Sequence, residues 1–191
     1  MSRSGRSRPI SIAVIAFAVS AWTLSGCGST EKKGSNVYKG HGVSFRYPHG
    51  WRQLKPHGLG QPGLWTVMVA PSSSPGADLA FLTAYRTPKV ITRKNLASKK
   101  PSITSTVAGA AQESGGALRS GPTPITMGGL PGYGFKITIV ASENRPSASR
   151  LVLVWKGKTE YFLNCQYLTK GVLGAEIERG CRMIVASFRL G

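Results

Sequence analysis

The chain has 191 residues, enough for one domain whose core needs neither a metal nor heavy disulfide cross-linking. Lys and Arg number 25 against 7 acidic residues, a formal net charge of +18, which favours anionic partners such as phospholipid head groups or acidic wall polymers. Solubility beside an anionic surface is the simpler explanation of the same charge. The 24 Gly and 12 Pro favour many short strands joined by tight turns.

Residues 1–26 have the organisation of an export signal. The first nine are polar and basic, and residues 10–24 are largely apolar but shorter than the roughly 20 residues of a spanning helix. The run ends in Leu24-Ser25-Gly26-Cys27, which resembles the lipobox of bacterial lipoproteins. The resemblance implies cleavage before Cys27 and transfer of a diacylglyceryl group to its thiol. The alternatives are an ordinary secretory leader with an unrelated cysteine, and an uncleaved anchor.

This leader predicts an exported protein, lipid-anchored to the cell membrane or cell envelope. The membrane lipid is then a partner through the acylated Cys27, whose two chains anchor stably without a spanning segment. Export argues against nucleic acid as a partner. Three basic residues leave with the leader, so 22 remain against 7 acids, a net charge of +15. We expect a signal peptide over residues 1–26, a lipidated flexible tether over 27–36 and a single globular domain over 37–191.

Within this domain, alternating and apolar segments predict seven strands, at 42–47, 64–70, 79–86, 118–126, 133–141, 149–156 and 159–168. Gly157-Lys158 is a plausible tight hairpin turn between the last two. Pro48-His49-Gly50 predicts a turn that places Trp51 on the sheet. In the polar segment 92–116, Ser102 is a candidate cap for a helix running through Ile103 and Val107, although the Thr content weakens that prediction.

The closing segment 172–188 has apolar residues at helical spacing, and Cys181 lies on that stripe. Cys165 lies on one face of the preceding strand, with Tyr161, Leu163 and Tyr167. If Cys27 carries lipid, these two cysteines remain as a pair, and a structural disulfide between strand and helix is the favoured interpretation in an oxidising compartment. Two buried free thiols and a redox-active pair are the alternatives.

Two stretches together resemble a known fold. They are the opening Gly42 to Trp51, and the closing Tyr161 to Arg189 through Cys165, Cys181, Met183, Ile184, Ser187 and Phe188. They are similar to PsbP-like domains, a fold that a group of actinobacterial lipoproteins also uses. The resemblance implies an α+β single domain, an antiparallel β-sheet with helices packed on its faces. It implies no reaction, because one fold serves unrelated functions.

The candidate chemistry in the sequence is sparse. His41, His49 and His57 recur every eight residues, but turn and strand positions at this spacing favour surface histidines over a metal site. No Gly-x-Ser-x-Gly motif appears, and the Gly-rich stretch 128–134 leads into a strand rather than a phosphate-binding helix. Glu176 and Glu178 are two apart on a helix and do not face each other. We therefore expect no enzymatic activity, no catalytic residues, no metal and no cofactor.

The remaining candidates concern binding. Between the third and fourth strands, a basic group is the better candidate for contact with lipid head groups or wall polymer, and a solvated face is the alternative; the group is Arg93, Lys94, Lys99 and Lys100. A second basic group lies on the closing helix or just after it, and a solvated face is favoured for it; the group is Arg179, Arg182 and Arg189. The expected function is a non-catalytic binding or interaction module of the cell envelope, with an envelope protein as a further candidate partner. The alternative is a carrier of a small apolar or lipid ligand in a sheet–helix cleft lined by Trp51, Trp65, Trp155 and Tyr167, and ordinary core packing is the simpler explanation of these aromatics.

Overall fold

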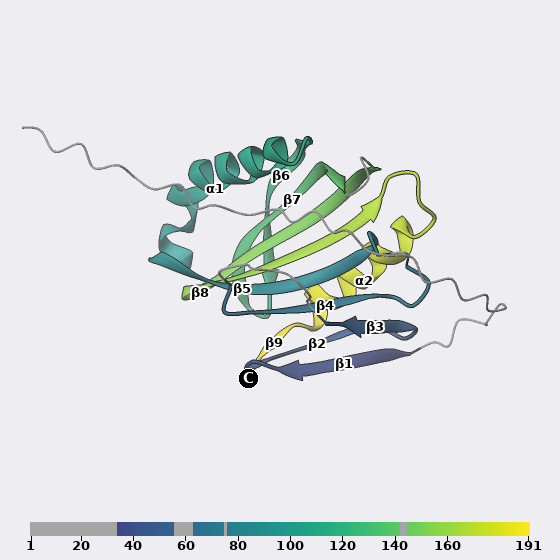
Figure 1. Cartoon of the computed structure of the whole chain (residues 1–191). Coiled ribbons are helices and arrows are strands. Elements are labelled where there is room, and N and C mark those ends of the chain that lie inside the picture. Colours follow the sequence, from purple (N-terminus) through teal and green to yellow (C-terminus); the bar gives the residue numbers. More distant parts are fainter. Residues whose placement is uncertain (1–33, 56–62, 75, 142–144) are drawn as a thin grey trace, which may run out of the picture.

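A computed structural model of the chain describes residues 34–55, 63–74, 76–141 and 145–191 (Figure 1). The signal peptide, Cys27, nearly all of the expected tether and His57 lie outside the described residues. No described helix combines the length and the apolar character needed to cross a bilayer.

The large sheet contains most of the predicted strands, in the order β3-β4-β5-β8-β7-β6, with antiparallel neighbours. Its strands are β3 (Trp51–Leu54), β4 (Trp65–Pro71), β5 (Leu79–Ile91), β6 (Ala117–Met127), β7 (Leu130–Ala141) and β8 (Arg145–Leu168). The predicted strand pattern is thus confirmed in outline, and β5 extends five residues beyond its predicted end. Alternation along each strand gives the sheet two buried faces.

Strand β8 folds back on itself at Gly157. Its first half pairs with β7 through residues 145–154, and its second half pairs with β5 through residues 157–166. The backbone N–H of Thr169 donates a hydrogen bond to the carbonyl of Pro146 at 3.1 Å, so the two ends of the segment meet. Gly157 has φ of +62°, a conformation that glycine adopts without strain. The predicted Gly157-Lys158 hairpin is therefore confirmed, and its two halves run side by side in Figure 1.

A second, three-stranded sheet has the order β1-β2-β9, from β1 (Ser35–Gly40), β2 (Val43–Pro48) and β9 (Arg189–Leu190). Only β2 was expected. β1 starts at Ser35, inside the expected tether, because Asn36 Nδ2 donates to the carbonyl of Trp51 and Ser35 Oγ accepts from Arg46 Nε. β1 therefore starts two residues before residue 37, the expected start of the domain.

Helix α2 (Gly174–Ser187) lies between the two sheets, where the sequence predicts a helix. Its buried residues Ile177, Cys181 and Ile184 join β2 and the inner face of the large sheet in one hydrophobic core. Helix α1 (Arg93–Glu113) packs on the opposite face, against β6 and β7, where Val107 and Ala111 meet a second core. The layers are therefore α1, large sheet, α2 and small sheet (Figure 1).

The predicted start of α1 at Ser102 is wrong. The helix begins at Arg93, after Thr92, whose backbone N–H donates to Asn95 Oδ1 at 2.8 Å. Pro101 lies inside the helix. Because serine is a favourable cap residue and proline is unfavourable inside a helix, local preferences favour a start at Ser102 instead.

Both cores, the Cys165–Cys181 disulfide and every described element come from residues 34–191. A segment with its own cores is able to fold as a unit. The α+β antiparallel architecture with helices on its faces is confirmed.

Candidate anion-binding surface

The carboxylates of the described residues are mostly engaged in structural contacts. Asp78 is buried, and its Oδ1 accepts the backbone N–H of Leu168 at 2.8 Å, where β8 ends beside the start of β5. Glu176 Oε1 accepts the indole N–H of Trp51 at 2.7 Å, which joins α2 to β3. Since these oxygens satisfy buried donors, they are poorly placed to serve as general bases.

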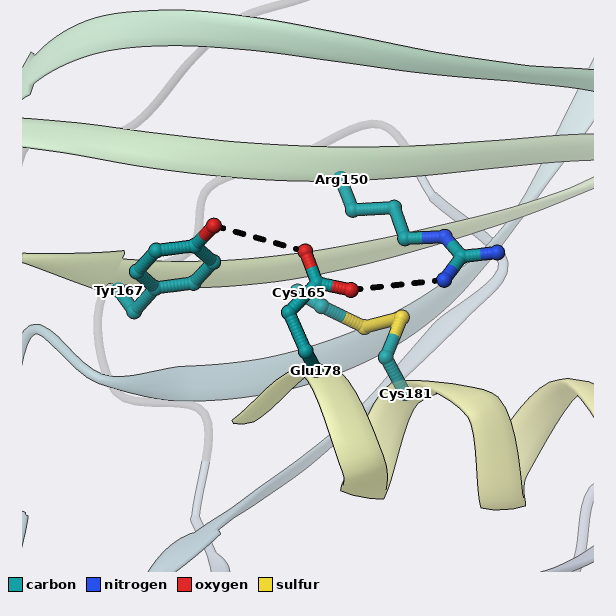
Figure 2. Close-up of polar contacts among 5 residues, drawn as sticks. All are labelled: Arg150, Cys165, Tyr167, Glu178 and Cys181. Carbon is teal, nitrogen blue, oxygen red and sulfur yellow. Dashed lines mark hydrogen bonds and ion pairs between the residues drawn. A yellow bond between two sulfur atoms is a disulfide. The ribbon is translucent and has the colours of Figure 1, made fainter. Parts of the chain in front are cut away.

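Glu178 links α2 to the large sheet beside the disulfide (Figure 2). Its Oε2 lies 3.4 Å from Arg150 Nη1, and the Tyr167 hydroxyl donates to Oε1 at 3.5 Å. Burial, followed by the charge of Glu178, raises the pKa of the Tyr167 phenol, which keeps it protonated. A carboxylate held between a guanidinium and a neutral phenol is a cross-link between elements, and Arg150 and Tyr167 were not expected in it.

Cys165 and Cys181 are joined in a disulfide with Cα atoms 6.0 Å apart. Both residues are fully buried, on the strand and on the helix where the sequence predicts them. The disulfide ties the outgoing half of β8 to α2, and burial on both sides favours the structural interpretation over the redox-active one.

Glu160 has an unusual environment. It lies opposite Tyr85 in the β5–β8 register, and Trp155 Nε1 donates to its Oε2 at 3.0 Å. Burial raises the pKa of Glu160 to about 7, and the indole hydrogen bond opposes that shift only in part. Near neutral pH this carboxyl therefore carries only part of a full negative charge.

The histidines do not converge within the described residues, where no group of three or more His, Cys, Asp or Glu side chains is placed to hold a metal. His41 and His49 are exposed near opposite ends of β2, and His57 lies outside the described residues. The His41 ring stacks on Trp65, with centroids 5.2 Å apart.

The four aromatic residues expected to line one ligand cleft do not do so. Trp51, Trp65 and Tyr167 belong to the core around α2, whereas Trp155 lies on the other face of the sheet, in the core beneath α1. Trp155 and Tyr167 both belong to β8, but the hairpin at Gly157 reverses which alternate residues face each core, so Trp155 packs with Leu153 beneath α1. One narrow cavity of about 20 Å³ lies between α1 and the sheet, beside Val107 and Phe162, with room for about one water molecule.

The predicted basic group lies on the first turns of α1, not in an irregular segment. Arg93, Lys94 and Lys100 are exposed, and Lys99 is half-buried. Folding adds cations that sequence reasoning missed. Ile91, two residues before Arg93, pairs with Gly157 of the hairpin, which brings Lys156 and Lys158 next to the end of β5. We call the combined surface the cationic pole; its residues, all exposed, are Arg86, Lys89, Arg93, Lys94, Lys156 and Lys158.

The cationic pole has no single sequence signature because its members come from two segments, 86–94 and 156–158, that are far apart in the chain. Figure 1 shows the start of α1, the end of β5 and the fold of β8 gathered at the left of the view. Within the described residues, Glu160 is the acidic side chain at this end, and its charge is reduced by burial. The surface can therefore attract phosphate- or carboxylate-bearing partners.

Comparison with known proteins supports the fold through structure only. No family model matches the sequence, and no curated protein matches it. Among solved structures, cyanobacterial PsbP (CyanoP) from Synechocystis sp. PCC 6803 is similar, with a TM-score of 0.55 and 15% identity over 88% of this chain and 99% of that one. LpqN of Mycobacterium tuberculosis, described as involved in cell envelope biogenesis, has a TM-score of 0.50 and 12% identity over 82% and 90% of the two chains.

A third similar structure, a Bacteroides thetaiotaomicron VPI-5482 protein, has a TM-score of 0.53 and 10% identity over 82% of this chain. This chain spans only 48% of that protein's length. At such identities the likeness shows the fold alone, which is PsbP-like, as the opening and closing motifs imply.

Proposed function

We propose that this protein is an exported lipoprotein, anchored to the membrane through acylated Cys27, whose domain is a non-catalytic interaction module of the cell envelope. The observation that carries the proposal is the order of basic start, apolar run and Leu-Ser-Gly-Cys in the leader. The similarity of the fold to LpqN, a protein involved in cell envelope biogenesis, supports an envelope role.

The polar side chains of the domain support a binding role over a catalytic one. Asp78, Glu160, Glu176 and Glu178 each bond to a backbone or side-chain donor in the folded domain. Four of the five described acidic residues are thus used in structural contacts, and the fifth, Glu113, is the last residue of α1. Chemistry by paired carboxylates has little support, whereas the exposed cations offer a surface for anionic envelope components.

In this proposal the partners are the membrane lipid at Cys27 and an anionic component, a head group or wall polymer, at α1. Arg93, Lys94, Lys99 and Lys100 are the proposed contacts, with the three exposed cations contributing more than the half-buried Lys99. A protein partner in the envelope remains compatible with the same surface.

The anchor is tested by changing the leader chemistry in cells. Replacing Leu24, Gly26 and Cys27 together by alanine converts the lipobox into an ordinary Ala-Ser-Ala cleavage site without an acyl acceptor. We expect the natural chain in the detergent phase of a Triton X-114 partition and the variant in the aqueous phase. A variant that stays in the detergent phase as fully as the natural chain would overturn lipid anchoring. Ser25→Ala alone is the matched control and leaves partitioning unchanged.

A further inference from the structure

The cationic pole is presented by backbone that hydrogen bonds keep in place. The register between β5 and β8 shifts between Arg86 and Ile91, so residues 87–90 bulge from the ladder. Thr87 Oγ1 donates to the carbonyl of Lys89 at 2.8 Å, and Asn95 Nδ2 donates to the carbonyl of Val90 at 3.0 Å. Because these bonds order the bulge in advance, a partner binds there without first ordering the backbone.

Two exposed apolar side chains lie at the same end of the sheet as these cations. Val90 lies in the bulge and is 46% exposed, and Leu64 is 53% exposed. The backbone N–H of Leu64 donates to the carbonyl of Ala84 at 2.7 Å, which places Leu64 at the same end of the sheet. Lysines and arginines mixed with exposed aliphatic side chains are typical of surfaces that lie in the bilayer interface. A hydrated polyanion, in contrast to a bilayer, would contact the Lys and Arg side chains and gain nothing from the aliphatic ones.

The acidic residues gather at the opposite end of the domain. Glu113 ends α1 there, Glu176 and Glu178 lie at the start of α2, and Asp78 lies before β5. The carbonyl of Gly34 accepts the N–H of His49 at 3.2 Å at this same end, where β1 begins. The chain that leads back to Cys27 thus leaves the end of the domain opposite the cationic pole, as the start of β1 at the right of Figure 1 shows.

We infer that the cationic pole is a docking surface for an anionic phospholipid bilayer, with the cations on head-group phosphates and Val90 and Leu64 in the head-group region. The inference deepens the proposed function, which supplies the bilayer. Charge complementarity and the two aliphatic side chains favour a bilayer over a wall polymer.

The length of the tether then restricts how the domain lies. The seven residues from Gly28 to Gly34 reach about 25 Å at full extension. The 13 residues of β5, which run from the Gly34 end to the cationic pole, span about 40 Å. An upright domain standing on its pole would hold Gly34 beyond reach of the lipid. With both ends attached, the long axis therefore lies within about 40° of the bilayer plane.

Vesicle binding tests the docking surface without the anchor. The probe protein is the chain Gly28–Gly191, which contains every described element and lacks Cys27, so its result does not depend on lipidation. We expect it to sediment with vesicles of equimolar phosphatidylglycerol and phosphatidylcholine but not with vesicles of pure phosphatidylcholine. Added salt should release the bound protein from the anionic vesicles. Neutralising four pole cations weakens the binding by about tenfold or more; the variant is Arg86→Gln, Lys89→Gln, Lys156→Gln and Lys158→Gln.

The matched control neutralises four exposed cations outside the cationic pole, and we expect it to lower vesicle binding by less than the pole variant does. The control is Arg52→Gln, Lys136→Gln, Lys170→Gln and Arg182→Gln. The double variant Leu64→Ser with Val90→Ser loses vesicle binding several-fold and keeps its affinity for soluble polyphosphate. Equal losses in the pole variant and the control would overturn the inference. The inference would also be overturned if the protein bound polyphosphate as tightly as it binds anionic vesicles and the double variant kept its full vesicle binding. That result would assign the surface to a polymer.

Discussion

At the scale of single residues, buried indoles and carboxylates are paired in ways that organise the domain. Trp51 donates to Glu176 of α2, and Trp155 donates to Glu160 across the hairpin of β8. A buried indole N–H without an acceptor costs free energy, so the two carboxylates have a structural role as acceptors for these donors. The clearest consequence of this arrangement concerns Glu160 and pH.

Glu160 makes stability depend on pH in a definite direction. Its pKa is about 7 in the folded domain against an ordinary value of 4.5, so the folded state holds the proton more tightly than the unfolded state. The contribution of Glu160 to the free energy of unfolding is therefore fully present below pH 4.5. It is lost as the pH rises through 7. The loss is at most about 3 kcal/mol.

The measurement is urea unfolding of the natural domain and of Glu160→Gln at pH 5, 6, 7 and 8. Glutamine keeps an acceptor for the Trp155 indole and does not titrate. We expect the natural domain to lose stability relative to the variant over this range. A constant difference between the two proteins would show that burial does not shift this pKa.

Two helical glycines provide a matched pair of substitutions. A Cβ at Gly180 would contact the ring of Trp51, which is 4% exposed and has no room to move, whereas a Cβ at Gly109 would meet nothing within 4 Å. Gly180→Ala is expected to destabilise the domain by about 1–3 kcal/mol through overpacking. Gly109→Ala is expected to stabilise it by about 0.5–1 kcal/mol through helix propensity. Thermal unfolding measures both, and equal effects in the same direction would contradict the packing of α2 on Trp51.

Residue-level prediction succeeds where periodicity alone decides the environment. The apolar periodicity places Cys165 and Cys181 on buried faces, and with Cys27 assigned to lipid and an oxidising compartment it favours the disulfide that the structure contains. The acceptor of the Trp155 indole is local, because Glu160 lies across the predicted hairpin. The acceptor of the Trp51 indole depends on a contact between distant segments, which no local pattern records. Glu176 is 125 residues from Trp51 in the sequence, so its role is visible only in the folded domain.

At the scale of elements, the two helices differ in how strongly their sequences specify them. α2 has an apolar stripe that includes Ile177, Cys181 and Ile184, and the sequence predicts it within two residues. α1 buries only four of its 21 residues and contains Pro101, so its pattern is weak and its start is misplaced. The short strands β1, β3 and β9 were also missed, because pairing with distant segments stabilises them more than local propensity does.

The disulfide is the covalent bond between β8 and α2. Removing it by Cys165→Ala with Cys181→Ala should lower the free energy of unfolding by about 3 kcal/mol, since it closes a loop of 16 residues. Chemical denaturation of the oxidised domain, the reduced domain and the double variant gives the comparison. The reduced domain and the variant should agree within the cost of the small cavity that alanine leaves. Oxidised and reduced domains of equal stability would contradict a disulfide that supports the fold.

At the scale of the whole molecule, the strand order decides where charge accumulates. The β5–β8 register brings the hairpin cations beside the start of α1, and the same topology places Asp78, Glu176 and Glu178 at the other end with the start of β1. The sequence predicts a basic protein and one basic group on this surface. It does not predict the separation of charge along the domain, because that depends on which distant strands become neighbours.

The lipid anchor determines how this separation of charge acts at a membrane. A domain attached at one end by a short tether, with its cations at the other end, meets a lipid surface in a restricted orientation. Without the anchor, the same cationic pole would be a general anion-binding surface in solution. The central claim is therefore the lipid on Cys27.

Intact-mass spectrometry of the protein purified from membranes of its own host tests that claim most directly. The account predicts a chain that begins at Cys27, with the added mass of a diacylglyceryl group on the thiol, and two hydrogens fewer for the Cys165–Cys181 disulfide. A mature chain that begins elsewhere, or an unmodified Cys27, would contradict it.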